Sequence, residues 1–288
     1  MIGILVVDKP RGISSSDVVV KVKKLLNEKK VGHMGTLDPL AEGVLPLGIG
    51  KATKLFDHYL KKTKEYIATF AFGEQTDTLD MEGKIVETSE VIPTKEQLEK
   101  AIEQNFLGKI TQLPPKFSSK KIAGKRACDI VRGGGEVNLS PCEVEIYSFE
   151  VIDEVEQGVF RFRILCSAGT YIRSLARDLA RSVESVATMT KLVRTKSGPF
   201  LLENAVKFDK LNYDEISSHI ISLEKALTDL QGVIVNDEEL SKLRNGIKYA
   251  KFIGKSGQKE DICVWKDNKV VGLGEVKDDG WLRIKIYF

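Results

Sequence analysis

The sequence predicts a mixed α/β protein with a small β-rich domain at its C-terminal end. Over most of the chain, apolar runs typical of strands alternate with segments that carry a helical apolar stripe. From about residue 232, short β-branched and aromatic segments separated by turn residues replace this alternation. A chain of 288 residues with 42% hydrophobic side chains is long enough for one large and one small domain. We therefore expect domains over residues 1–230 and 231–288.

The first predicted elements are a buried strand and a basic helix. Residues 2–7 form an apolar run that ends in the turn Asp8-Lys9-Pro10, which is typical of a buried strand. Ser15 or Ser16 is expected to cap the following helix, with Asp17 in its first turn. The apolar stripe of this helix comprises Val18, Val22, Leu25 and Leu26. Its solvated face is expected to carry Lys21, Lys23 and Lys24.

A loop over residues 33–46 contains the acid that is the strongest candidate for chemistry. Asp38 lies between apolar neighbours, and glycines and prolines punctuate the segment, so neither a helix nor a strand is expected. A carboxylate held among apolar residues on a rigid loop resists desolvation, which makes it a candidate catalytic group. The alternative is an Asp-Pro turn in which the acid bonds its own backbone.

A strand, a helix and a long basic loop are predicted next. Residues 66–72 are rich in β-branched and aromatic side chains, as in a strand. Thr94-Lys95-Glu96-Gln97 is a capping box for a helix that Gly108 is expected to end. Residues 114–126 are too punctuated for a regular element, and we expect a long basic loop with a functional role.

A further strand and helix precede the β-rich end of the chain. Residues 160–164 alternate apolar residues with arginines, which indicates a half-buried strand. The helix after Gly169-Thr170 turns Ile172, Leu175, Leu179 and Val183 inward, and places Arg173 and Arg177 on a different face. Short C-terminal strands are expected at residues 262–265, 270–276 and 281–287.

The charges are segregated along the chain although the net charge is only +3. Residues 1–64 carry 12 basic and 6 acidic side chains, and residues 109–126 carry 6 basic and none acidic. Residues 65–104 show the reverse, with 10 acidic and 3 basic side chains. Segregated positive charge suits a polyanion such as nucleic acid, although a single lysine cluster is more often a solvated helix face.

The cysteines and histidines indicate neither a metal site nor a disulfide framework. The four cysteines show no CxxC spacing, and the three histidines form no ligand motif. The N-terminus turns polar too soon for a signal peptide, and no run approaches about 18 apolar residues. We therefore expect a cytoplasmic protein without a bound metal or a membrane span.

Five segments, taken in order, resemble the motifs of the TruB-type tRNA pseudouridine synthases. The loop around Asp38, within Gly-His-Met-Gly-Thr-Leu-Asp-Pro-Leu-Ala, is similar to the catalytic motif of that family. The other segments are Val6-Val7-Asp8-Lys9-Pro10 with Gly12-Ile13-Ser14-Ser15, Lys64-Glu65-Tyr66 with residues 73–78, residues 114–118 with 124–127, and Gly169-Thr170-Tyr171-Ile172-Arg173 with Leu192-Val193-Arg194-Thr195. The chain departs from the family pattern at Ser119-Lys120-Lys121, Cys128 and Val193.

The resemblance implies a fold, a reaction and a partner. The fold is a large mixed, mostly antiparallel sheet flanked by helices, followed by a small domain that resembles the PUA RNA-binding domain only loosely. The reaction converts uridine 55 in the T-loop of tRNA into pseudouridine, in which C5 of the base replaces N1 at C1′. Because no redox change occurs, no cofactor is needed. The T-arm of tRNA is the implied partner, and we expect the enzyme to act as a monomer.

The resemblance also assigns catalytic roles. Asp38 would attack C1′ or C6, or assist elimination across C1′ and C2′, and the sequence leaves these routes open. Arg173 would keep that carboxylate ionised, and its alternative is a solvated helix arginine. Tyr66 would stack on the target base and help to move a proton, and its alternative is an ordinary core tyrosine.

Five further residues are implied to contact the RNA. Tyr171 and Leu192 would contact the bound nucleotide, and His33 would brace the nucleotides displaced when the base is extruded from its stack. Lys9 and Lys125 would contact phosphates or serve a structural role. The basic loop and the first helix would hold the RNA without reading its sequence.

Two other classes of function remain open at this stage. A catalytically silent RNA-binding protein could use the same scaffold, although Asp38, Tyr66 and Arg173 are all present. A glycoside hydrolase would need two carboxylates flanking the bond, and only Glu42 lies near Asp38 in the sequence. Product formation separates the first class from an enzyme, and released uracil would indicate the second.

Overall fold

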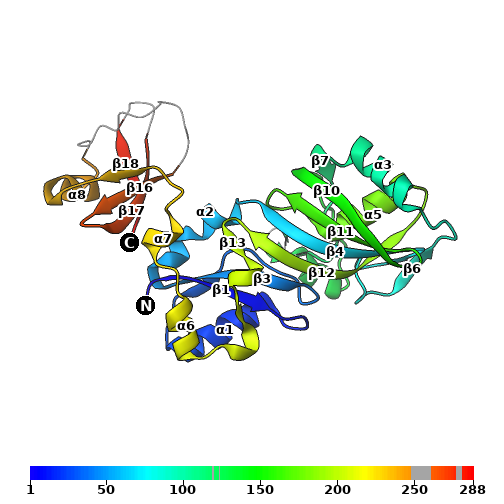
Figure 1. Cartoon of the computed structure of the whole chain (residues 1–288), viewed down its shortest axis with the longest axis horizontal. Helices are drawn as coiled ribbons and strands as arrows, with labels where there is room; N and C mark the ends of the chain where they lie inside the picture. The colour runs from blue at the N-terminus through cyan, green and yellow to red at the C-terminus, as the bar shows by residue number, and fades with distance from the viewer. Residues whose placement is uncertain (119, 123, 248–260, 277–280) are drawn as a thin grey trace.

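A computed structural model describes residues 1–118, 120–122, 124–247, 261–276 and 281–288 (Figure 1). Within these residues the dominant feature is a ten-stranded sheet. Its main path runs through β14 (Val206–Lys207), β1 (Gly3–Lys9), β3 (Glu42–Ile49), β12 (Ala187–Ser197), β4 (Lys64–Phe72), β11 (Val159–Cys166), β10 (Cys142–Glu156) and β7 (Gly108–Gln112). β2 (Val31–His33) pairs with β3, and β13 (Phe200–Leu201) pairs with β12.

The predicted mixed, mostly antiparallel sheet is confirmed. In the described part of the chain, only β1 with β14 and β3 with β12 pair in parallel, and the other neighbours in this sheet are antiparallel. Phe160, Phe162 and Ile164 of β11 are fully buried while Arg161 and Arg163 are exposed, as their alternation predicts.

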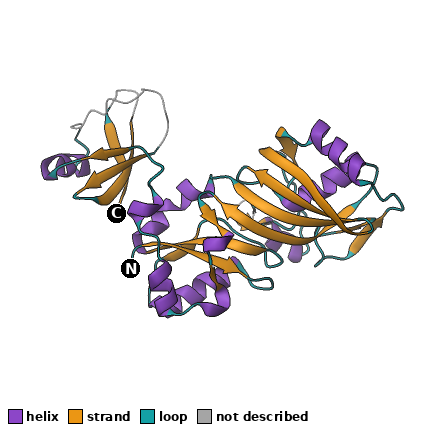
Figure 2. Ribbon diagram, in the orientation of Figure 1, coloured by secondary structure: helices purple, strands orange, loops and turns teal. Residues whose placement is uncertain are grey.

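Helices cover the sheet in two groups (Figure 2). α3 (Lys95–Asn105) packs on β10, and α5 (Ile172–Ser182) packs on β12 and on α3. α1 (Ser15–Leu26) packs beside β2, and α6 (Tyr213–His219) packs beside β1. The Thr94–Gln97 capping box of α3 is confirmed, but the helix ends at Asn105, and Gly108 instead opens β7.

The N-cap of α1 differs from the prediction. Ser14, not Ser15 or Ser16, caps the helix, in a capping box with Asp17. The Ser15 hydroxyl is buried instead, where it accepts from the Leu37 amide at 2.9 Å and donates to the Leu37 carbonyl at 2.9 Å. Ser15 therefore ties α1 to the loop that carries Asp38.

Two other predictions are wrong in part. Lys21 does not lie free in water, because its ammonium group donates to the Phe208 carbonyl at 2.7 Å and lies 4.1 Å from the centre of the Phe208 ring. The basic segment 114–126 contains an antiparallel pair of short strands, β8 (Lys121–Ile122) and β9 (Lys125–Arg126), which α4 (Ala127–Arg132) follows. The pair fits a segment with a glycine at position 124, which adopts a φ of +84°.

The C-terminal residues form a second sheet at one end of the molecule (Figure 1). Its order is β15 (Gly232–Ile234), β16 (Ile262–Lys266), β17 (Lys269–Val276) and β18 (Leu282–Tyr287), which agrees with the three predicted strands and adds β15. α8 (Asp237–Arg244) packs beside β18. No helix in the described ranges is long and apolar enough to cross a membrane.

An apolar cluster joins the two sheets. Leu55, Tyr59 and Leu227 are buried in the same cluster as Cys263 and Leu273 of the second sheet. Tyr59 belongs to α2 (Phe56–Leu60), which follows the 3₁₀ helix η1 (Gly50–Leu55), and Leu227 follows α7 (Leu223–Ala226). The Tyr59 hydroxyl donates to the Ala226 carbonyl at 2.6 Å. The C-terminal sheet is therefore packed against the large sheet through a shared core.

Candidate functional site

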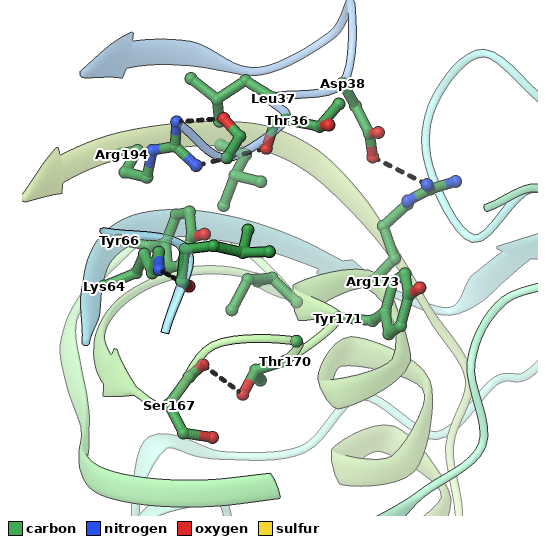
Figure 3. A pocket seen from close by; sticks show the side chains of 15 residues that line it. Thr36, Leu37, Asp38, Lys64, Tyr66, Ser167, Thr170, Tyr171, Arg173 and Arg194 are labelled. Atoms are coloured by element: carbon green, nitrogen blue, oxygen red, sulfur yellow. Dashed lines mark hydrogen bonds and ion pairs between the residues drawn. The ribbon is translucent and has the colours of Figure 1, made fainter. Parts of the chain in front are cut away.

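Five of the eight predicted site residues line one cavity of about 220 Å³ (Figure 3). The cavity lies where the Asp38 loop, β4, β12 and the start of α5 meet. The five predicted residues that line it are Asp38, Tyr66, Tyr171, Arg173 and Leu192. They come from four segments that are far apart in the sequence, so the fold itself assembles the site.

Asp38 and Arg173 form an ion pair at this cavity (Figure 3). Arg173 Nη2 donates to Asp38 Oδ2 at 2.7 Å. The Arg173 side chain is only 7% exposed, whereas that of Asp38 is 43% exposed. The carboxylate is therefore accessible to solvent, while its charge partner is buried. The Asp38 side chain pairs with Arg173, which argues against the alternative of an Asp-Pro turn in which the acid bonds its own backbone.

A second carboxylate that the sequence analysis missed holds the other side of Arg173. Arg173 Nη1 donates to Asp80 Oδ2 at 3.1 Å, and the Asp80 side chain is 7% exposed. Asp80 Oδ1 in turn accepts from the Thr78 hydroxyl at 2.7 Å and from the Glu82 amide at 3.1 Å. The sequence signal that could have identified Asp80 is the regular spacing of Thr76, Thr78 and Asp80. Asp80 itself lies two positions beyond segment 73–78, which resembles the family motif.

Two backbone carbonyls complete the surroundings of the Arg173 guanidinium. Nη1 also donates to the Thr78 carbonyl at 3.1 Å, and Nη2 also donates to the Phe117 carbonyl at 3.0 Å. The planar fork thus serves four acceptors from three loops. Phe117 belongs to the basic segment, so the ion pair and that segment share one arginine.

A second buried arginine, also missed as a site residue, shapes the Asp38 loop. Arg194 on β12 is 1% exposed. Its Nε donates to the Val44 carbonyl at 2.7 Å, Nη1 to Thr36 at 3.2 Å and Nη2 to Gly35 at 3.1 Å. Backbone carbonyls of a loop that are buried without partners are costly, so Arg194 allows the loop to be buried next to β12.

Lys9 supports the same loop from the other side. It is fully buried, and its ammonium group donates to the carbonyls of Pro10 at 2.9 Å, Ile13 at 2.8 Å and Pro39 at 3.4 Å. Burial lowers the pKa of Lys9 to about 8. With no exposed surface and three bonds to carbonyls, Lys9 has the structural role rather than that of a phosphate contact.

Tyr66 and Leu192 are the predicted site residues that the large sheet contributes to the cavity wall. They lie on the neighbouring strands β4 and β12, where Tyr66 is opposite Arg194 and Leu192 is opposite Ala68. Both side chains are largely buried yet line the cavity. Burial raises the pKa of Tyr66, so its hydroxyl keeps its proton near neutral pH.

Lys64 lines the cavity beside Tyr66, although the sequence analysis gave it no role. Its ammonium group donates to the carbonyls of Leu60 at 2.5 Å, Lys62 at 2.6 Å and Tyr59 at 3.4 Å. Burial lowers the pKa of Lys64 to about 8. These bonds hold the C-terminal end of α2 next to β4, where Leu60 and Lys64 both line the cavity.

His33 is not among the described residues that line the cavity, and the position of the Lys125 side chain is not described. His33 lies on β2 opposite Leu47, and its Nδ1 is buried without a hydrogen-bond partner among the described residues. Burial, followed by the charge of Arg194, lowers the pKa of His33, so the ring is neutral near pH 7. Lys125 belongs to β9, and its side chain lies outside the described part of the structure.

The site offers a carboxylate, a fixed guanidinium, a buried phenol and apolar walls. No group of three or more His, Cys, Asp or Glu side chains that could hold a metal ion is found among the described residues. Such a site can place a planar base against Tyr66 and Leu192 while Asp38 acts on the attached sugar or ring.

Comparisons with known proteins identify the relatives of this chain. The family model described as TruB family pseudouridylate synthase (N terminal domain) matches residues 23–172. The chain is 37% identical to tRNA pseudouridine synthase B of Clostridium kluyveri, with all of both chains covered, and 43% identical to that of Rickettsia bellii, with 83% of each covered.

Among solved structures, a chain in the crystal structure of a Cbf5-Nop10-Gar1 complex superposes with a TM-score of 0.73 at 25% identity, over 99% of this chain and 84% of that one. A chain in the structure of an H/ACA RNP bound to a substrate RNA containing 2′-deoxyuridine gives a TM-score of 0.71 at the same identity. The family match includes Asp38, Tyr66 and Tyr171, which line the cavity, and it ends at Ile172, the first residue of α5. This chain belongs to the TruB family of pseudouridylate synthases.

Proposed function

We propose that this enzyme converts uridine 55 in the T-loop of tRNA into pseudouridine, with Asp38 as the catalytic carboxylate. The observation that carries the proposal is the Asp38–Arg173 ion pair at a cavity with Tyr66 on its wall. Full-length relatives that bear the name tRNA pseudouridine synthase B support tRNA as the substrate.

The chemistry requires one bond exchange at C1′. The N1–C1′ bond breaks, the uracil turns over, and C5 bonds to C1′; C5 then loses its proton and N1 gains one. Attack at C1′, attack at C6 and elimination across C1′ and C2′ each require an ionised Asp38. Arg173 Nη2 donates to the Asp38 carboxylate at 2.7 Å and so fixes the orientation of that carboxylate at the cavity.

Binding of the base requires that it leave its stack in the folded RNA. Unstacking costs a few kcal/mol, and stacking on Tyr66 with contacts to Tyr171 and Leu192 offsets that cost. His33, on the edge strand outside the cavity, braces the nucleotides that the base leaves behind. Lys125 and the other basic residues of segment 114–126 hold phosphates and position the T-arm.

We assign the reaction to the part of the chain with the large sheet, and additional RNA contacts to the part with the C-terminal sheet. Residues 1–230 form the catalytic domain, and residues 231–288 form a PUA-like domain that adds RNA contacts. The residues of the proposed site belong to one chain, so a monomer suffices for the reaction. A tRNA substrate fits a cytoplasmic enzyme.

The test is to map pseudouridine in tRNA incubated with and without the protein. We expect Asp38→Asn and Asp38→Ala to abolish product while tRNA affinity changes little, because the carboxylate acts in the reaction and contributes little to binding. Asp214→Asn, at an exposed position on α6, is the control and should retain full activity.

The outcomes also separate the rival functions. Binding of tRNA without product would favour a silent RNA-binding protein. Release of free uracil would favour a glycoside hydrolase. The geometry argues against the hydrolase, because the second carboxylate near Arg173, Asp80, is buried with both of its oxygens hydrogen-bonded.

A further inference from the structure

A buried glutamine lies behind the cavity at the end of β7. Gln112 is fully buried, although the sequence analysis gave it no role. Burying an amide is costly unless its donor and acceptor are both paired. Both are paired here, and to a single residue: Oε1 accepts from the Tyr171 amide at 2.8 Å, and Nε2 donates to the Tyr171 carbonyl at 3.0 Å.

The residue after Gln112 extends the same connection. The Leu113 carbonyl accepts from the Ser174 hydroxyl at 2.8 Å and from Arg177 Nη2 at 3.0 Å. Four hydrogen bonds therefore join the end of β7 to the first two turns of α5. This connection spans about 60 residues of sequence, so it is a tertiary clamp and not a local turn.

The clamp satisfies one of the free amides at the start of α5. Tyr171 is the N-cap residue of α5, and its own side chain makes no capping hydrogen bond. The Tyr171 amide donates to Gln112, which here takes the part that the N3 side chain plays in a capping box and so ties the start of the helix to β7. Tyr171 lines the cavity, and Arg173, two residues further on, is the partner of Asp38.

We infer that Gln112 is a positioning residue for catalysis, which sets the start of α5 and thereby the places of Tyr171 and Arg173 in the site. The inference rests on the proposed function, because it assigns Gln112 to that reaction. A misplacement of about 1 Å in a reacting group can lower a rate about 100-fold, so a clamp on this backbone has a catalytic effect without touching the substrate.

Gln112→Glu tests the clamp with almost no change of shape. A protonated carboxyl group can accept from the Tyr171 amide and donate to the Tyr171 carbonyl, as the amide does. An ionised carboxylate can only accept, and it faces the carbonyl oxygen with a negative charge. The rate of the variant relative to the wild type should therefore be near one at acid pH and at least about 10-fold lower once the carboxyl ionises.

The midpoint of that loss depends on the neighbours of the variant carboxyl. Burial raises its pKa, and the guanidinium of Arg177 on the adjacent Leu113 carbonyl lowers it. The Cys142 thiol, which donates to the Gln112 carbonyl at 3.5 Å, and the Tyr171 phenol are further titratable groups on residues that contact Gln112. The wild-type amide does not titrate, so the ratio of the two rates isolates the introduced group.

The measurement is single-turnover pseudouridine formation from about pH 5 to about pH 9, with tRNA affinity determined in parallel. Gln112→Met, which fills the same space without hydrogen bonds, should be slower at every pH with affinity unchanged. Gln75 is a matched control, since it is also largely buried but its Oε1 has no hydrogen-bond partner among the described residues. For Gln75→Glu, the ratio of the variant rate to the wild-type rate should not rise as the pH is lowered.

Each outcome decides a separate question. A flat rate ratio for Gln112→Glu, or an active Gln112→Met, would overturn the clamp while the wild type still makes product. Loss of activity only where circular dichroism shows loss of fold would make Gln112 a general stability residue and would also overturn the positioning role. A wild type that makes no pseudouridine would instead overturn the proposed function.

Discussion

Arg173 is the residue on which the proposed site depends most. Its guanidinium bonds the accessible Asp38 through Nη2 and the buried Asp80 through Nη1, and each of these nitrogens also donates to one backbone carbonyl. Asp80 is fixed by Thr78, so it holds the arginine in place, while Asp38 stays accessible to the substrate. One carboxylate thus acts as an anchor and the other is free to react.

Arg173→Lys should lower turnover by about 100-fold or more while tRNA binding persists. A lysine keeps the charge, but its single ammonium group cannot occupy both ends of a planar fork, so Asp38 loses either its partner or its orientation. Single-turnover kinetics together with a binding assay will measure this. Arg181→Lys is the control on the same helix, because Arg181 is exposed and pairs with Glu87. Equal losses in the two variants would contradict the specific role of Arg173.

The resemblance to the family's motifs pointed to Asp38, Tyr66 and Arg173, whereas the supporting residues were not assigned roles. Asp80 lies 93 positions from Arg173, and Arg194 reaches carbonyls about 150 positions away. A single sequence does not show that a charged residue is buried. Nothing in the residues around Arg194 distinguishes it from an exposed arginine on a strand, although it is 1% exposed. For Lys9 the sequence left a phosphate contact and a structural role open, and its ammonium group donates to backbone carbonyls.

At the scale of elements, the joint between β3 and β12 holds the two halves of the large sheet together. The two strands pair in parallel over a short register, with Val193 opposite Glu42 and Arg194 opposite Gly43. Gly43 has a φ of +101°, and a Cβ there would lie 2.3 Å from the Arg194 carbonyl oxygen. The joint therefore needs a glycine for both conformation and space.

Gly43→Ala should lower the free energy of unfolding by about 3 kcal/mol or more, because strain and a backbone clash add together. Gly108→Ala separates the two causes, since Gly108 has a φ of +76° but no atom within 4 Å of the added carbon. We expect that control to cost only about 1–2 kcal/mol. Chemical denaturation of both variants gives the comparison, and equal costs would show that the contact with β12 is unimportant.

Local signals explain which elements could be predicted. The strands of alternating or continuous apolar residues and the Thr94 capping box were found because their signals are contained within a few residues. The cap of α1 was misplaced by one residue because three serines stand in a row, and only the contact of Ser15 with Leu37 selects Ser14. α8 was overlooked although Asn236 and Glu239 form a capping box.

At the scale of the whole molecule, the buried apolar residues of the described ranges form three clusters. One lies within the large sheet and its helices, a second joins that sheet to the C-terminal one, and a third lies between α8 and the C-terminal sheet. His58 Nδ1 and Asp261 Oδ2, 3.2 Å apart, add a polar contact across the same boundary. The C-terminal residues are therefore part of the stability of the enzyme as well as a proposed RNA contact.

Leu273→Ala tests that dependence, because Leu273 is 1% exposed in the shared cluster. Its loss should cost about 2–5 kcal/mol and lower the temperature of a single cooperative transition. Ile234→Ala, at a position on the same sheet that is 82% exposed, should change stability by less than about 0.5 kcal/mol. Calorimetry would contradict the shared core if the C-terminal part melted separately at a lower temperature.

The position of β12 in the middle of the large sheet has a consequence for synthesis on the ribosome. β3 ends at Ile49, but its neighbour β12 begins only at Ala187, and Ile4 of β1 exchanges backbone hydrogen bonds with Ile221. The N-terminal strands therefore keep one edge without its hydrogen-bonding partner until β12 has been translated. We expect the large sheet to be completed late in translation, with this edge of the N-terminal strands exposed until β12 has been made.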